Sequence, residues 1–249
     1  MLRTSRSPIF SEARDFVTAI YDRQLRLVAQ TAYIPVLLAA TPWAVRSIAE
    51  MYADDTYEGD VFILNDPYRG NNHPPDFTIA QPVFVAGELR FWSVTKGHQA
   101  DTGGGGAVGY HPEARDVWDE GLRIPPAKLY DRGKVNRGMW ELILSNVRLR
   151  FLVEGDLNCL VGAAGLGERN ITTLVQKYGV TAVEHVIEKL LAAAEKHMRE
   201  EIRKIPNGIY RAARQIDNDG IVHRERSCGH LSSDAQSTSP AAYCRNTGA

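Results

Sequence analysis

The sequence lacks paired cysteines. Its three cysteines, Cys159, Cys228 and Cys244, lie far apart and form no CxxC pair. Neither a disulfide framework nor a zinc ribbon is therefore indicated, and this cysteine usage fits a reducing cytoplasm.

The sequence also has no excess of one charge and no long apolar run. Its 29 Lys and Arg residues against 30 Asp and Glu residues give a net charge of -1, so we expect no nucleic-acid or anionic-membrane partner. The longest apolar stretch, IPVLLAATPWAV, is short and interrupted by proline, and no apolar segment follows the charged start MLRTSRSPIF. We predict neither export nor a membrane span, and a cytoplasmic location.

The last part of the chain has few large apolar residues. Residues 224–249 are rich in serine and contain no Ile, Val, Phe, Trp or Met, which predicts a disordered tail. The spacing of Cys228, His230 and Cys244 in this tail matches no familiar ligand pattern. We therefore assign these three residues no metal.

The composition that remains is that of a globular protein. The 249 residues are 44% hydrophobic and 24% charged, enough for one large domain or two small ones. Alternating apolar residues over 16–30 predict a β-hairpin, and Thr41 and Pro42 predict the start of a helix that ends near Ala53. The apolar run within 59–66 predicts a buried strand.

The second half of the chain carries long amphipathic patterns typical of helices, from about residue 138 to 204. His185 and His197 lie among charged residues in these patterns, so we interpret them as helix surface. The predicted fold class is α+β. Its predicted parts are a mixed hairpin and sheet region at 1–137, a mainly helical region at 138–223, and a disordered or frameshifted tail at 224–249.

Two histidine-aspartate pairs stand out in the first part. His73 precedes Asp76 by three residues, and His98 precedes Asp101 by the same spacing. Between the pairs, alternating apolar residues on both sides of the turn residues 86–87 predict a second β-hairpin.

A hairpin that turns at residues 86–87 brings the two pairs together. Counting outward from the turn places Asp76 opposite Gly97 and His98 opposite Pro75. Since cross-strand neighbours lie about 5 Å apart, the residues of both pairs are expected to share one site.

Two interpretations of this site stay open at this point. Two imidazoles and a carboxylate at the end of a hairpin can form an open divalent-metal site, in which the remaining positions take water or substrate. Alternatively, His73 and His98 form hydrogen bonds only to loop carbonyls, because HxxD is a common pattern.

Four longer motifs carry a resemblance to a known family. GDVFILNDPYRGNNHPPDFTIAQPVFVAGEL, KGHQADTGG, EGLRIPPAKLY and VGAAGLGER resemble the hydantoinase B/acetone carboxylase alpha family, which includes subunits of N-methylhydantoinase, 5-oxoprolinase and acetophenone carboxylase. The resemblance extends from about Phe10 to Val222, and the motifs follow the order and spacing of the family.

The resemblance implies roles for the paired residues. A divalent metal, manganese, zinc or iron, would be held by His73, Asp76 and His98. Asp101 matches the next acidic position, where we expect it to support a ligand or move a proton. The resemblance thus implies Asp101 and His98 as catalytic residues.

The resemblance also implies an ATP-dependent reaction on a cyclic amide or a ketone, with ATP bound by a hydantoinase A-like partner protein. The sequence is consistent with this division, since it has no GxxxxGK[ST] motif. Its GxGxxG, from Gly104 to Gly109, does not open a predicted helix after a strand and is weak evidence for a nucleotide.

Several residues near the pairs keep two interpretations. Arg123 either binds an anionic group or shapes a surface connection. Asn65 and Asp66 either contribute to the site or form the turn that ends a strand. The glycines at 103–106 either approach a ligand through their amides or give plain flexibility.

Two hypotheses of different class follow. In the first, the chain is a shortened subunit of a hydantoinase, 5-oxoprolinase or ketone carboxylase, because the resemblance ends before the serine-rich tail. In the second, the chain is a catalytically silent fragment that only binds a hydantoinase A-like partner.

Overall fold

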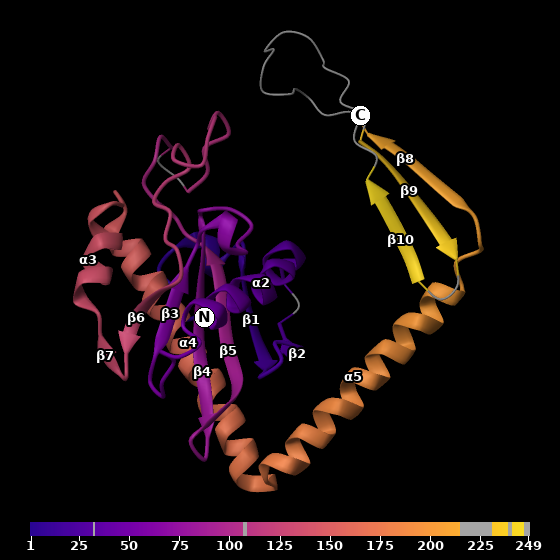
Figure 1. The fold of residues 1–249 in the computed structure, drawn as a ribbon. Coiled ribbons are helices and arrows are strands. Elements are labelled where there is room, and N and C mark those ends of the chain that lie inside the picture. The colour runs from indigo at the N-terminus through magenta and orange to yellow at the C-terminus, as the bar shows by residue number, and fades with distance from the viewer. Residues whose placement is uncertain (32, 107–108, 215–230, 239–240, 247–249) are drawn as a thin grey trace. The chain divides into compact units, whose positions relative to one another are not determined.

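Figure 1 shows the computed structural model of the protein, which describes residues 1–31, 33–106, 109–214, 231–238 and 241–246. The chain divides into two compact units, Met1–Glu184 and His185–Ala249. The first unit contains all four residues of the two histidine-aspartate pairs.

The first unit is built on a seven-stranded sheet in which every pairing of neighbours is antiparallel. The strand order is β2-β1-β5-β4-β3-β6-β7. The strands are β1 (Phe16–Asp22), β2 (Leu27–Gln30), β3 (Val61–Leu64), β4 (Asp76–Val85), β5 (Glu88–His98), β6 (Ala127–Asp131) and β7 (Lys134–Val135).

Helices accompany this sheet, which confirms the predicted α+β class and the mainly helical second half. The helices are α1 (Pro8–Ser11), α2 (Pro35–Met51), the 3-10 helix η1 (Pro67–Arg69), α3 (Arg137–Ser145), α4 (Arg150–Tyr178) and α5 (Val180–Arg203). No helix within the described ranges combines the length and the apolarity that crossing a membrane requires.

The sheet is covered on both faces, by α2 on one and by α4 on the other (Figure 1). In β3, Phe62 belongs to the hydrophobic core beneath α2, whereas its neighbour Ile63 belongs to the core that α3 and α4 share with the sheet. Because α3 and α4 complete this second core, they belong to the first compact unit. The boundary between the units therefore follows Glu184, later in the chain than the predicted boundary at residue 137.

Both predicted hairpins are present. β1 pairs with β2, and β4 pairs with β5. The second hairpin turns at Ala86 and Gly87, whose φ angles are 52° and 82°. Positive φ at both central residues gives the turn the twist that a two-residue hairpin needs.

The register of the β4–β5 hairpin differs from the prediction by one residue. Phe84 lies opposite Leu89, but the next pair joins Val83 to Phe91, so the register shifts between them. This bulge adds one residue to β5 close to the turn. As a result, Asp76 lies opposite His98 and not opposite Gly97.

Helix α2 begins earlier than predicted, at Pro35, and contains Pro42 in its interior. A proline there leaves the carbonyl of Leu38 without its helical N–H donor. The hydroxyl of Thr41 donates to this carbonyl at 2.7 Å and replaces the missing bond. Thr41 therefore supports the proline inside the helix, and the prediction of Thr41 as the helix start is wrong.

The second unit contains most of α5 and a three-stranded antiparallel sheet with the order β10-β9-β8. Its strands are β8 (Ile209–Arg214), β9 (Leu231–Thr238) and β10 (Ala241–Asn246). His185 and His197 on α5 are exposed, as predicted.

The structure places two of these strands, β9 and β10, within the segment that the sequence predicts as a disordered tail. Strand pairing uses backbone N–H and C=O groups, which a polar sequence supplies without any apolar period. The rest of the predicted tail, including Cys228 and His230, lies outside the described residues.

Candidate metal centre

Three predicted ligands meet at one end of the β4–β5 hairpin. Asp76 begins β4 and His98 ends β5, and the two residues are direct cross-strand partners. His73 lies in the loop before β4, and one ligand atom from each of the three residues lies within 4.8 Å of the others. The structure thus brings these residues together, as the hairpin predicts.

The carboxylate of Asp76 lies between the two histidines. His73 Nδ1 is 3.1 Å from Asp76 Oδ2, and His98 Nδ1 is 3.2 Å from Asp76 Oδ1. The Asp76 side chain is fully buried, whereas the side chain of His73 is 31% exposed. The cluster therefore has a buried carboxylate and one histidine that reaches solvent.

Asn71 fixes the loop that carries His73. Its side-chain amide donates to the backbone carbonyls of Asn65, His73 and Asp76 at 2.7 to 2.9 Å, and its side-chain oxygen accepts from Thr78 Oγ1 at 3.1 Å. One buried side chain thus ties the end of β3, the loop and the start of β4 together. This fixes the backbone on both sides of the candidate ligands.

The electrostatics of the cluster favour a charged Asp76. Burial alone raises the pKa of Asp76, but hydrogen bonds from His73 and His98 outweigh burial and hold the pKa at about 2. Burial lowers the pKa of His73, and the hydrogen bond to Asp76 more than compensates, so this pKa lies above its usual value. Protons on the histidines thus balance the carboxylate where a cation could replace them.

The donor set suits a divalent metal. Imidazole nitrogens and carboxylate oxygens are ligands for zinc, manganese and iron. The side-chain oxygen of Asn72, next to His73, is buried and has no hydrogen-bond partner in the described parts of the chain. The cluster therefore offers three donors and one unused buried oxygen, and these residues fit a metal ion.

Asp15 is a neighbour of the cluster that the sequence patterns did not reveal. Its backbone oxygen accepts from His98 N at 3.0 Å. Burial raises the pKa of Asp15, and the charges of His98 and Asp76 act on it with opposite sign. Asp15 precedes β1, and only the pairing of β1 with β5 brings it to the site.

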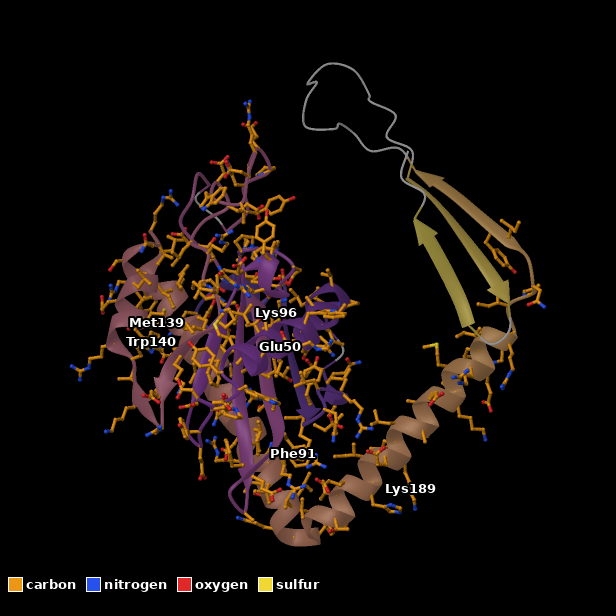
Figure 2. The ribbon with its side chains drawn as sticks, viewed as in Figure 1. Glu50, Phe91, Lys96, Met139, Trp140 and Lys189 are labelled. Carbon is orange, nitrogen blue, oxygen red and sulfur yellow. The ribbon has the colours of Figure 1, made fainter. Side chains whose placement is uncertain are left out.

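Lys96 is a second neighbour that the sequence patterns did not reveal. It is fully buried in the middle of the first unit (Figure 2), and its Nζ has no hydrogen-bond partner among the residues described. Burial lowers the pKa of Lys96 to about 8, and the charge of Asp76 opposes this effect. The strand period could have identified it, because Lys96 lies two residues before His98 and so on the same face of β5.

A hollow of about 360 Å³ adjoins the cluster. His73 and Asn72 form part of its wall, and η1 and the segment 114–120 form the rest. Its lining includes Pro67, Tyr68, Pro74, Ala114, Arg115 and Val117. A larger hollow of about 570 Å³ is lined by β1, α4 and the N-terminal residues, and none of the three candidate ligands lines it.

Comparison with known proteins assigns the family. Residues 1–244 match the family described as Hydantoinase B/oxoprolinase. The chain belongs to this family. The resemblance carried by the four sequence motifs is thereby confirmed.

Relatives in the hydantoinase B/oxoprolinase family share about a third of their residues with the chain. It is 38% identical over 94% of its length to the beta subunit of the caprolactamase of Pseudomonas jessenii, and 35% identical over 87% to a putative D-/L-hydantoinase component, the B subunit, of Pseudomonas sp. strain NS671. A solved structure of the ATP-dependent caprolactamase from Pseudomonas jessenii superposes with a TM-score of 0.91 at 35% identity and covers 99% of the chain. A structure of acetone carboxylase superposes with a TM-score of 0.84 at 17% identity over 96% of the chain, which shows a shared fold.

The chain spans about two-fifths of the length of these relatives, 39% and 38% of the two curated proteins and 42% of the caprolactamase chain. The family match is longer than the motifs predicted, since it continues past Val222 to residue 244. The prediction that the resemblance ends near Val222 is therefore wrong. The motifs did not reveal the serine-rich segment because polar strands carry few distinctive side chains.

Asp101, the matched acidic position after His98, lies against the N-terminus of α4. Its carboxylate accepts from Gly103 N and Leu149 N, each at 2.9 Å, and also from Arg148 N. The amides of Arg148 and Leu149 immediately precede α4, so Asp101 stabilises the N-terminus of this helix. The structure therefore favours a positioning role for Asp101, and it does not bring this carboxylate into the three-ligand cluster.

The glycine run after Asp101 is held by Arg148. The guanidinium of Arg148 donates to Gly104 O at 2.6 Å and to Gly106 O at 3.1 Å. No helix begins in the described residues of this loop, so the GxGxxG does not have the strand-turn-helix context of a dinucleotide site.

The remaining candidates, Asn65, Asp66 and Arg123, serve the architecture. Asn65 donates to Pro74 O and Leu122 O and accepts from Ile124 N, which holds three segments together. Asp66 accepts from Tyr68 N and caps η1. The guanidinium of Arg123 lies 3.7 Å from Asp66 and over the rings of Tyr68 and Trp118. These contacts favour the interpretation of Arg123 as part of a surface connection.

Proposed function

We propose that the chain is a subunit of an ATP-dependent enzyme that opens a cyclic amide, with a divalent metal held by His73, Asp76 and His98. The observation that carries this proposal is the meeting of three donor side chains within 4.8 Å in a member of the hydantoinase B/oxoprolinase family. The adjoining hollow gives a substrate access to His73.

A cyclic amide is favoured over a ketone by the relatives. Those described as caprolactamase and hydantoinase subunits are 38% and 35% identical to the chain, whereas the acetophenone carboxylase delta subunit is 28% identical. Lactams and hydantoins are rings that contain an amide bond. Ring-opening hydrolysis is therefore the reaction that we assign.

The chain's own residues supply binding and orientation. When bound, a divalent metal polarises a carbonyl oxygen or acidifies a water molecule. Asp76 remains charged through the physiological range because its pKa is about 2, and the loop that Asn71 ties down fixes the direction of His73. The apolar side chains of the hollow, such as Pro67 and Val117, would face the hydrocarbon part of a ring.

ATP is assigned to a partner protein. The sequence contains no GxxxxGK[ST] motif, and a solved relative is described as an ATP-dependent caprolactamase. We propose that a hydantoinase A-like chain binds ATP and activates the amide, and that the metal centre of this chain completes hydrolysis.

The first test is the metal content of the purified chain, compared between the parent and His98→Ala. Near-stoichiometric manganese, zinc or iron in the parent that is lost in the variant supports the proposal. His197→Ala, at an exposed position on α5, is the matched control and should keep the metal. A folded parent that takes up none of the three ions would contradict the metal centre.

The second test is turnover of lactam, hydantoin, 5-oxoproline and ketone substrates by the parent, with ATP and a hydantoinase A-like partner. Ring opening that depends on ATP and is lost in His98→Ala supports the reaction. A stable complex that turns over none of the substrates would favour a silent, partner-binding role.

A further inference from the structure

The side-chain amide of Asn72 lies against two of the three candidate ligands. Its Nδ2 is 3.2 Å from His73 Nδ1 and donates a hydrogen bond to Asp76 Oδ2. Its Oδ1 is buried and accepts no hydrogen bond from the described residues. The amide therefore satisfies its donor at the cluster and leaves its acceptor unused.

This orientation suits a cluster held by protons and conflicts with one that holds a cation. If His73 and Asp76 direct their lone pairs to a metal ion, the hydrogens of Nδ2 point toward the same positive charge. The two ends of an amide have nearly the same shape, so a half-turn of the group exchanges Nδ2 and Oδ1 without moving the backbone. The turned amide presents an oxygen to the site that a cation would occupy.

Asn72 can turn because its neighbour holds the loop. The amide of Asn71 uses its nitrogen for three carbonyls and its oxygen for Thr78 Oγ1, which fixes the backbone around residue 72. The hydrogen bonds of the Asn72 side chain, by contrast, go to His73 and Asp76, which are themselves candidate ligands. The two adjacent asparagines thus have different tasks.

We propose that Asn72 is a fourth protein ligand of the divalent metal and binds it through Oδ1. This inference rests on the proposed function, since it requires a metal on His73, Asp76 and His98. A neutral amide oxygen adds a ligand without adding charge, and it makes the donor set harder, which suits Mn²⁺ better than a purely nitrogen set does. Positions for water and substrate remain in a six-coordinate centre.

The test measures the dissociation constant for Mn²⁺ with the metal-stripped chain, and the visible absorption of the Co²⁺-loaded chain. Asn72→Leu keeps the size of the side chain and removes the oxygen, so affinity should fall by at least about tenfold and the cobalt spectrum should change. Asn72→Asp retains an oxygen and adds a charge, so its affinity should equal or exceed that of the parent. Asn158→Leu, at an exposed position on α4, is the control and should match the parent.

The outcomes separate this inference from the proposed function. A parent that binds Mn²⁺ and an Asn72→Leu variant with the same affinity and the same cobalt spectrum would overturn the fourth ligand and leave the three-ligand centre intact. A parent that binds no metal would overturn both. If Asn72→Leu does not fold, Asn72→Asp decides, because a loss of affinity in that variant contradicts an oxygen ligand at residue 72.

Discussion

Asp76 depends on its neighbours to stay charged within the protein. The side chain is fully buried, and without compensation burial would favour the neutral acid. Hydrogen bonds from His73 and His98 reverse this preference. The same charge that makes Asp76 a metal ligand therefore also contributes to the stability of the metal-free fold.

The stability of the metal-free chain should depend on Asp76 in acid. Its pKa is about 2 in the folded protein against a usual 3.8, so the charged form stabilises the fold above pH 3.8 and this contribution is lost as the pH falls through 2. The difference corresponds to about 2 kcal/mol. We expect the free energy of unfolding of the parent, relative to Asp76→Asn, to fall by this amount as the pH drops from above 3.8 to below 2, measured by urea unfolding with a chelator.

The control for this prediction is Asp54→Asn, at an exposed position on the same unit. A difference between parent and Asp76→Asn that is independent of pH would show that the histidines do not hold the carboxylate in its charged form.

The residues of the site differ in how far sequence could predict them. His73, Asp76 and His98 follow from two spacings and one hairpin, because the contacts between them are local to that hairpin. Asp15 and Asn72 do not follow from spacing. Asp15 reaches the site only through the pairing of β1 with β5, and the contacts of Asn72 depend on the path of an irregular loop.

At the scale of elements, sequence predicted which segments pair but not their register. The turn at Ala86 and Gly87 follows from residue type, whereas the shift between Val83 and Phe84 leaves no mark in the apolar pattern. Helix α2 shows the same limit, since Pro42 signals a helix start unless another group satisfies the freed carbonyl. Backbone hydrogen bonding decides both cases.

Helix α4 offers a matched pair of substitutions that tests its packing on the sheet. Gly162 is exposed and has open space around it, so Gly162→Ala should stabilise the fold by about 0.5 to 1 kcal/mol through helix propensity. A methyl group on Gly167 would overlap Ser93 Oγ, which donates to Ala164 O at 2.7 Å. Gly167→Ala should therefore destabilise by about 1 to 3 kcal/mol.

Urea unfolding midpoints of the two variants give the comparison. Equal shifts for both glycines would mean that α4 does not approach β5 as closely as the Ser93 contact requires.

At the scale of the whole molecule, the order of the strands could not be read from the sequence. Neighbours in the sheet such as β1 and β5 are separated by β3, β4 and α2 along the chain, and no local pattern encodes that pairing. For the same reason, the predicted boundary at residue 137 separated α3 and α4 from the sheet with which they share a core. The division after Glu184 follows from long-range packing.

This division makes a prediction about the first unit. Residues 1–184 contain the seven-stranded sheet, both hydrophobic cores and all three candidate ligands. A chain ending at Glu184 should therefore fold cooperatively and bind Mn²⁺ with a dissociation constant within about threefold of the full chain, because each ligand keeps its neighbours. Circular dichroism during urea unfolding and a metal titration measure the two properties. A truncated chain that folds but binds at least about tenfold more weakly would show that residues beyond Glu184 help to form the metal centre, since a factor of ten corresponds to about 1.4 kcal/mol of lost binding free energy.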